Sequence, residues 1–179
     1  MREHAEILRR LDVSVTEVKS LHQFREIDGL VIPGGESTTI SKLLRIFGLF
    51  DPLLDLIRQG LPVFGTCAGL IILAQRLTDG IEGQETLGVL DVTVRRNAFG
   101  HQTASFETSL EVQGMDRPVA AAFIRAPIIT EVGSQASTLS TLDDGSVVAV
   151  RQERLLGISF HPEICNETAL HDYFVREVV

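Results

Sequence analysis

Polar and apolar residues follow two different periods along the first part of the chain. Apolar side chains recur at helical spacing over residues 3–11, which predicts a short helix. The alternation in DVSVTEV, residues 12–18, predicts a strand. The apolar run GLVIPGG, residues 29–35, predicts a buried strand that ends in a glycine turn.

The same succession of strand and helix continues to residue 77. Helical spacing predicts helices over residues 37–49 and 51–60, the second with Asp at its start, Pro in its first turn and Gly at its end. A short apolar strand over residues 61–65 and a mostly apolar helix over residues 68–77 follow. Strands that alternate with helices over short turns favour a parallel sheet with helices on both faces.

The second half of the chain is richer in strand patterns. Apolar and alternating runs predict strands over residues 87–97, 104–114 and 119–124. Residues 137–160 predict an antiparallel meander that turns at an Asp-Gly pair, and a last helix begins near Asn166. We therefore expect one α/β domain with a parallel core and an antiparallel extension.

Composition limits the partners of this domain, which we expect to span residues 1–179. The formal net charge is −8, and no cluster of Lys and Arg points to nucleic acid. The chain has no apolar signal segment at its start, and its apolar runs are too short for a membrane span. Cys67 and Cys165 form neither a disulfide framework nor a paired zinc spacing. We expect no nucleic acid, membrane or metal, and a cytoplasmic location.

Cys67 lies between two glycines in G-T-C-A-G, residues 65–69, where a predicted strand leads into a predicted helix. Such a cysteine is a small buried hydrophobe, a metal ligand, half of a disulfide or a nucleophile. The glycines permit the backbone angles of a sharp turn and leave the sulfur accessible, while the N-terminus of the helix favours a thiolate. The pattern is that of a nucleophile turn with cysteine in place of serine. Cys165 lacks flanking glycines, and we expect it to be structural.

A thiolate nucleophile needs a base, and His161 fits that role best among the five histidines. It follows the predicted strand LLGISF in the segment F-H-P-E, where Pro162 fixes a turn and Glu163 can hold the imidazole. Taken alone, a His-Pro turn with a solvated Glu is an equal alternative. The other histidines are expected to face solvent or to cap local backbone: His4, His22, His101 and His171.

A third segment, PGGES at residues 33–37, ends an earlier predicted strand. Its glycines allow backbone N–H groups to point at a developing oxyanion, and the helix that follows adds positive potential at its N-terminus. An ordinary turn is the alternative, and a phosphate loop is disfavoured because its lysine is missing. Beside the other two segments we prefer the oxyanion role, with the backbone of Gly35 and Ala68 as donors.

Together these segments resemble the class I, or triad, glutamine amidotransferases. Five segments narrow the resemblance to the glutaminase subunits of pyridoxal 5′-phosphate synthases: LVIPGGESTTI, VFGTCAGLIILA, RRNAFGHQTASFE, FIRAPII and LGISFHPE. They occur in this order across nearly the whole chain. The resemblance implies a three-layer, flavodoxin-like α/β fold with a mostly parallel central sheet and an antiparallel extension.

The resemblance also implies a reaction. Cys67 attacks the side-chain amide of L-glutamine, His161 passes a proton to the leaving ammonia, Glu163 orients His161, and water clears the glutamyl thioester. The positions that match the glutamine contacts of the family are Gly34, Gly35, Glu36, Ser37, Arg96, Ile124 and Arg125. An arginine suits the α-carboxylate of the substrate and Glu36 suits its ammonium. Taken singly, either arginine fits a solvated surface better.

In this family the ammonia passes to a (β/α)8-barrel synthase subunit within a large assembly, and the glutaminase is nearly silent until it docks. Pyridoxal 5′-phosphate is the product of the complex, so we expect no cofactor in this chain. Members begin with an apolar strand that ends in Leu-Gln-Gly, whereas this chain starts on the helix that follows. We therefore expect an upstream start, or an impaired form with poor stability and weak activation.

Other functions stay open. Cysteine hydrolases and thiol-stress proteins also place a cysteine at a strand-to-helix turn, but they need neither F-H-P-E nor P-G-G-E-S. Glutaminase subunits of other pathways are closer, and R-N-A-F-G with F-I-R-A-P argues against them. A catalytically dead regulatory module is disfavoured by the intact set of Cys67, His161 and Glu163.

Overall fold

Helices and strands alternate through the first half of the molecule, and strands dominate the second. The computed structural model describes residues 1–81, 83–96 and 105–179. The first elements are α1 (Arg2–Arg10), a 3₁₀ turn η1 (Leu21–Glu26), β1 (Leu30–Ile32), α2 (Ser37–Ile46), α3 (Phe50–Arg58), β2 (Val63–Thr66), α4 (Ala68–Leu73) and β3 (Ala74–Leu77). The others are β4 (Leu90–Arg95), β5 (Phe106–Leu110), β6 (Val119–Phe123), β7 (Ile128–Val132), β8 (Ser137–Thr141), β9 (Val147–Gln152), β10 (Leu155–Ile158), α5 (Ala169–Tyr173) and a π turn η2 (Phe174–Val178).

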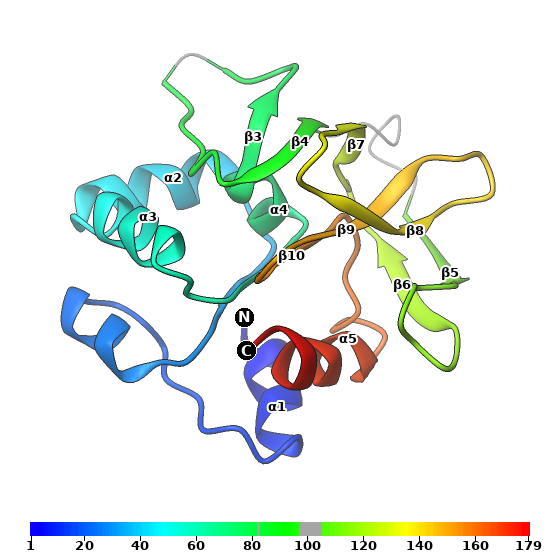
Figure 1. The fold of residues 1–179 in the computed structure, drawn as a ribbon, viewed down its shortest axis with the longest axis horizontal. Coiled ribbons are helices and arrows are strands. Elements are labelled where there is room, and N and C mark those ends of the chain that lie inside the picture. Colours follow the sequence, from blue (N-terminus) through cyan, green and yellow to red (C-terminus); the bar gives the residue numbers. More distant parts are fainter. Residues whose placement is uncertain (82, 97–104) are drawn as a thin grey trace.

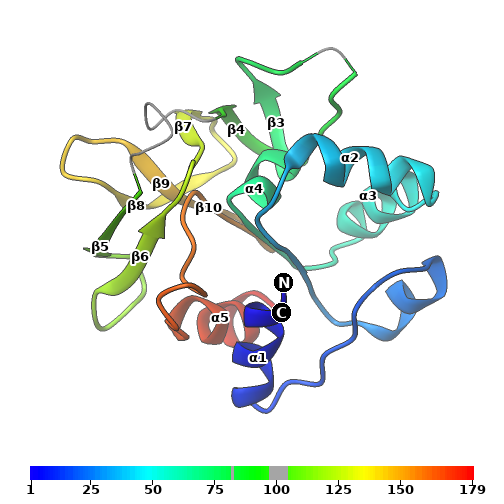
Figure 2. The same ribbon diagram turned by 180° about the vertical axis from the view of Figure 1, so that it is seen from behind.

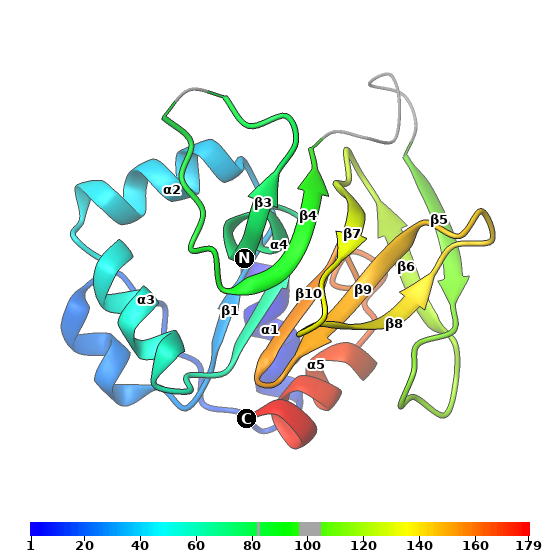
Figure 3. The same ribbon diagram turned by 45° about the horizontal axis from the view of Figure 1, so that its top comes forward.

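A mixed sheet lies at the centre of the fold, with the order β1-β2-β10-β9-β7-β4-β3 and with β8 paired to β9 (Figure 3). The pairs β1–β2, β2–β10 and β3–β4 are parallel. The pairs β10–β9, β9–β7, β7–β4 and β8–β9 are antiparallel, so the antiparallel part is larger than the sequence predicted. A separate hairpin, β5–β6, lies beside the sheet. The predicted meander over residues 137–160 is confirmed as β8, β9 and β10.

Alternate side chains of the central strands enter two different cores. Val63 and Leu155 pack with α3 and α4 on one face of the sheet, where side chains of α2 also join the edge of the cluster. Their neighbours Phe64 and Leu156 pack on the other face with α5 and η2. Figures 1 and 2 show α1 beside α5, away from α2 and α3. The layers are therefore helices, sheet and helices, as expected for an α/β fold.

Two local predictions are wrong, and one strand was not predicted. Residues 12–18 alternate but form no strand, because no neighbouring strand in the described residues supplies a ladder of hydrogen bonds. The helix predicted over residues 68–77 ends at Leu73, and β3 follows because it pairs in parallel with β4. No sequence pattern predicted β7, which joins β4 to β9. Among the described helices none is long and apolar enough to cross a membrane.

Candidate active site

Three neighbouring strand ends bring the segments singled out in the sequence to one edge of the sheet. Strands β1, β2 and β10 are parallel, and Ile32, Gly65 and Gly157 lie opposite one another in their ladders. Gly34 and Cys67 follow two residues later on their strands. The carboxyl ends of parallel strands are where open α/β sheets form sites. A site is thus expected just beyond these three strands.

The side chains do meet there. A Cβ atom built on Gly34 would lie 2.5 Å from Cε1 of His161 and 3.5 Å from Cβ of Cys67. The backbone N–H of Cys67 donates to the carbonyl of Ile158 at 2.8 Å, which continues the β2–β10 pairing up to the thiol. Glycine at position 34 is therefore required, since any side chain would displace the imidazole.

Cys67 carries the strain of the turn on its own backbone. Its φ of 50° and ψ of −102° lie in a sparsely populated region, which costs about 1–3 kcal/mol and is typical of functional positions. We expected the flanking glycines to supply the unusual angles, and this is wrong: neither belongs to the glycines with positive φ. They allow close packing instead, because a Cβ on Gly69 would lie 2.0 Å from the carbonyl oxygen of Ile32. The helix α4 begins at Ala68, directly after the thiol.

His161 and Glu163 form a buried pair next to Cys67. The imidazole Nδ1 lies 2.7 Å from Oε1 of Glu163. Burial lowers the pKa of His161, but hydrogen bonds and charge from Cys67 and Glu163 outweigh this and raise that pKa to about 10. The raised pKa favours the imidazolium form of His161, which lies between Cys67 and Glu163. In that state it has a proton to give.

Glu163 is held from a second side by residues that the sequence analysis placed elsewhere. His4 and His171 were expected at the surface or on local backbone, and both are buried, with exposed fractions of 3% and 0%. Nε2 of His4 lies 3.3 Å from Oε1 of Glu163. Burial raises the pKa of Glu163, but the hydrogen bonds and charges of His161 and His4 together bring it well below its usual range. The carboxylate stays ionised.

A second group of predicted residues is joined by a side chain that the sequence gave no signal for. Gln84 donates through Nε2 to Oγ of Ser37 at 3.0 Å and accepts through Oε1 from Nη1 of Arg96. The backbone N–H of Arg96 also donates to Asp79 at 2.8 Å. Gln84 lies in an irregular segment without periodicity, so nothing in the pattern marked it. It fixes the Arg96 guanidinium near the first turn of α2.

The remaining predicted residues lie in the loops that follow β1 and β6, which we call the rim. His161 pairs with Ala122 of β6 in an isolated antiparallel bridge, and Ile124 and Arg125 follow two and three residues after Ala122. Arg125 has a φ of 49°, a second strained backbone position. Gly35 and Glu36 are exposed in the loop before α2. The middle of the RRNAFGHQTASFE segment, residues 97–104 with His101, lies outside the described residues.

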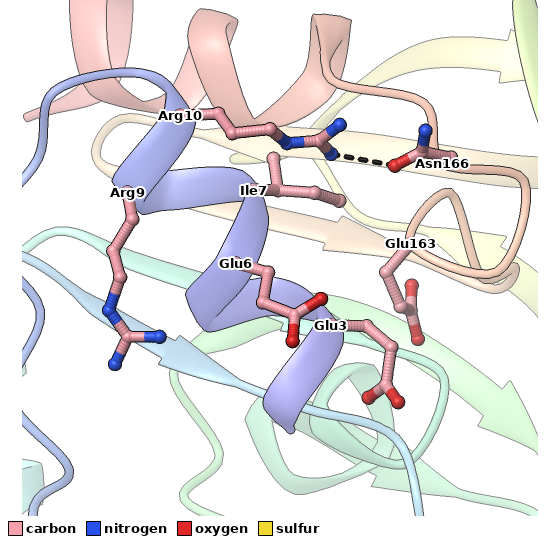
Figure 4. A pocket seen from close by; sticks show the side chains of 7 residues that line it. All are labelled: Glu3, Glu6, Ile7, Arg9, Arg10, Glu163 and Asn166. Carbon is pink, nitrogen blue, oxygen red and sulfur yellow. Dashed lines mark hydrogen bonds between the residues drawn. The ribbon is translucent and has the colours of Figure 1, made fainter.

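A cavity of about 420 Å³ opens on the far side of Glu163 (Figure 4). Its lining is mostly charged and comes largely from α1: Glu3, Glu6, Ile7, Arg9, Arg10, Glu163 and Asn166. Arg10 donates to Oδ1 of Asn166 at 2.7 Å and so ties α1 to the loop that carries Glu163. Oε2 of Glu163 is buried and has no hydrogen-bond partner among the described residues. In the part of the chain that the structure describes, no group of three or more His, Cys, Asp or Glu side chains is placed to hold a metal ion.

Comparison with known proteins identifies the family of this chain. Residues 1–179 match the model of the SNO glutamine amidotransferase family. The chain belongs to this family. Among curated relatives, "Pyridoxal 5′-phosphate synthase subunit PdxT" of Corynebacterium jeikeium is 52% identical, over 98% of this chain and 90% of that protein. The protein of the same name from Clavibacter michiganensis is 53% identical, over 99% of this chain and 86% of that protein.

Solved structures agree with this membership of the glutamine amidotransferases. One described as a glutamine amidotransferase superposes with a TM-score of 0.91 at 43% identity, and covers 97% of this chain and 91% of that one. A putative GMP synthase subunit from Thermoplasma acidophilum has a TM-score of 0.69 at 17% identity, over 97% of this chain and 85% of that one, which shows a shared fold alone. The α/β glutamine amidotransferase fold expected from the sequence is confirmed.

Proposed function

We propose that this chain hydrolyses L-glutamine to L-glutamate and ammonia with Cys67, His161 and Glu163, as the glutaminase subunit of a pyridoxal 5′-phosphate synthase. The observation that carries the proposal is the meeting of these three side chains at the ends of β2 and β10. Family membership and the names of the curated relatives support the substrate and the pathway. The catalytic roles rest on the geometry.

The proposed reaction begins with attack of the Cys67 sulfur on the side-chain carbonyl carbon of glutamine. The tetrahedral intermediate places its negative charge near the backbone of Gly35 and Ala68, our proposed oxyanion donors. His161 gives its proton to the departing nitrogen, and ammonia leaves as the thioester forms. Water, activated by the now neutral His161, then attacks the thioester and releases glutamate. One glutamine and one water give one glutamate and one ammonia.

We further propose that the rim holds the amino-acid end of glutamine. Arg96 is our proposed partner for the α-carboxylate and Glu36 for the α-ammonium, with Ser37, Ile124 and Arg125 around them. The link through Gln84 supports this, because it holds the Arg96 side chain beside the first turn of α2. An arginine left free on a surface would lose more rotamer freedom on binding than one already fixed.

The proposal includes a partner, and it excludes a cofactor. The names of the relatives describe a subunit of a synthase, so the ammonia is expected to pass to a synthase subunit, which the sequence resemblance describes as a (β/α)8 barrel. Pyridoxal 5′-phosphate is then the product of that partner and no group bound to this chain. A large hetero-oligomer and a cytoplasmic location remain parts of the proposal.

The test is glutamate formation from glutamine, measured with and without the synthase subunit. We expect activity that depends on the partner and that disappears in Cys67→Ala. Release of glutamate by Cys67→Ala at the wild-type rate would reject the proposed nucleophile. If the unmodified chain releases no glutamate even with the synthase subunit present, the proposed reaction is rejected.

A further inference from the structure

Two buried histidines from different helices lie beneath the carboxylate of Glu163. His4 comes from the first turn of α1 and His171 from α5. Nδ1 of His4 lies 2.8 Å from Nε2 of His171, and the two rings are 5.1 Å apart at 45°. Burying imidazoles costs free energy that an apolar pair of the same size would not, so their presence calls for a reason.

The geometry fixes which atom of His4 faces the carboxylate. Nε2 of His4 lies 3.3 Å from Oε1 of Glu163, the oxygen that is also 2.7 Å from Nδ1 of His161. An ionised carboxylate only accepts, so an imidazole nitrogen that bonds it must carry a proton. Oγ1 of Thr66, at the end of β2, lies 3.4 Å from the same His4 nitrogen. Two imidazole N–H groups therefore converge on one oxygen of Glu163.

His171 favours one tautomer of a neutral His4. Burial lowers the pKa of His171 to about 4, so it is neutral at pH 7. Its Nδ1 has no partner among the described residues, which leaves Nε2–H as the donor to Nδ1 of His4 when both rings are neutral. That hydrogen bond keeps the proton of His4 on Nε2. In the neutral pair the hydrogen bonds thus have one direction: His171 donates to His4, and His4 donates to Glu163.

The other charged groups around this pair do not replace it. Arg10 of α1 and Glu167 in the loop before α5 act on His171 through space, as does Glu163. Glu3 of α1 lies within the electrostatic field of Glu163, but its carboxylate accepts a hydrogen bond from the amino group of Met1. Glu167 is engaged by Arg117. Among the described groups of α1, α5 and the loop between β10 and α5, His161 and His4 are the only titratable groups that bond the Glu163 carboxylate.

We propose that His4, oriented by His171, is a positioning residue that holds the Glu163 carboxylate against His161. The proposal rests on the proposed function, because it assigns Glu163 the task of orienting the base. Without the N–H of His4, Glu163 has one donor instead of two and a rotamer less tightly fixed. The imidazolium of His161 then loses support, and with it the neighbouring thiolate. The contribution reaches the reaction only through Glu163.

The experiment compares His4→Leu with His4→Gln. Leucine fills the space without a donor, whereas the amide nitrogen of glutamine reaches the place of Nε2. For glutamate formation with the synthase subunit we expect His4→Leu to lower kcat roughly 10-fold or more with KM little changed, since a hydrogen bond to a charged group is lost. His4→Gln should recover most of the rate. His22→Gln is the control, an exposed histidine that bonds only Ser20 in the described structure.

A second readout separates positioning from folding and does not depend on glutamine. Iodoacetamide alkylates the thiolate of Cys67, and its rate against pH reports the ion pair with His161. We expect the midpoint of this profile to move to higher pH in His4→Leu and to return toward the wild-type value in His4→Gln. If His4→Leu does not fold, as judged by circular dichroism, His171→Phe serves instead, because Phe64 already packs edge-on against that ring.

Each outcome has one meaning. A lower kcat together with a shifted alkylation profile supports the positioning role. A lower kcat with an unchanged profile indicates a merely structural residue and overturns it, as does wild-type behaviour of His4→Leu in both assays. If the wild type releases no glutamate while its alkylation profile still responds to His4, the positioning role stands and the proposed reaction fails.

Discussion

The close approach of α4 to β1 gives a sharp prediction at Gly69. A Cβ at this position would lie 2.0 Å from the carbonyl oxygen of Ile32 and 2.9 Å from its carbon. Both are backbone atoms, so no side chain can turn away, and α4 and β1 must separate by well over 1 Å to bring the 2.0 Å approach to ordinary contact. Overpacking of this kind costs roughly 1–3 kcal/mol, and more when backbone must move. Alanine in a helix recovers at most about 1 kcal/mol relative to glycine.

We therefore expect Gly69→Ala to lower the free energy of unfolding by about 2 kcal/mol and the Tm by roughly 4–8 °C, measured by urea and thermal denaturation. Because Ile32 lies two residues before Gly34, the shift should also disturb the packing of Gly34 on His161 and lower kcat/KM. Gly80→Ala is the matched control, since its Cβ would meet only Leu77 at 3.6 Å. A Gly69→Ala variant as stable and active as the wild type would refute the reasoning.

Three further predictions follow from side chains around the site. The pKa of His171 falls from 6.5 to about 4 on folding, so its contribution to stability is complete above pH 6.5 and is lost as the pH falls. In urea titrations the free energy of unfolding should therefore drop by about 2 kcal/mol between pH 7 and pH 5. The drop should be smaller in His171→Phe. Gln84→Leu should raise KM for glutamine with kcat little changed, because Arg96 loses its support. Burial raises the pKa of Glu167, but Arg117 and two backbone N–H groups lower it to about 2, so this stabilisation exists above pH 4.5 and fades toward pH 2. Arg117→Ala should therefore destabilise the protein at pH 7 more than at pH 3, which chemical unfolding at both values measures.

The sequence predicted the strand, turn and helix around Cys67 well because local patterns determine them. Strand, glycine turn and helix follow one another within a few residues at Cys67, and the segment around His161 repeats this logic at another strand end. Parallel neighbours must then bring these ends together. The geometry confirms that Cys67, His161 and Glu163 meet, and that Gly34 packs on two of them.

What the sequence did not show depends on contacts between distant segments. His4 and His171 are 167 residues apart, and an isolated histidine in a helix gives no sign of which residue it will meet. The same holds for Gln84, which bonds Ser37 across 47 residues. At β3, residues with helical spacing became a strand because β4 offers a parallel partner. At residues 12–18 a strand pattern found no partner among the strands that the structure describes.

The helix layer on the α5 side of the sheet therefore does more than cover apolar strands. It places His171 in the core formed by Phe64 and Phe174, and α1 lies against it with His4 on its inner side. The outer side of α1 carries Glu3, Glu6 and Arg10 into the cavity that ends at Glu163. Residues on both sides of α1 thus lie around the carboxylate of Glu163. A displacement of α1 would change the distance from His4 to Glu163, whereas a displacement of α2 would change the distance from Ser37 to Gln84. The support of the proposed base and the proposed hold on the substrate are accordingly separate parts of the structure. Mutations in the first should change mainly kcat, and mutations in the second mainly KM.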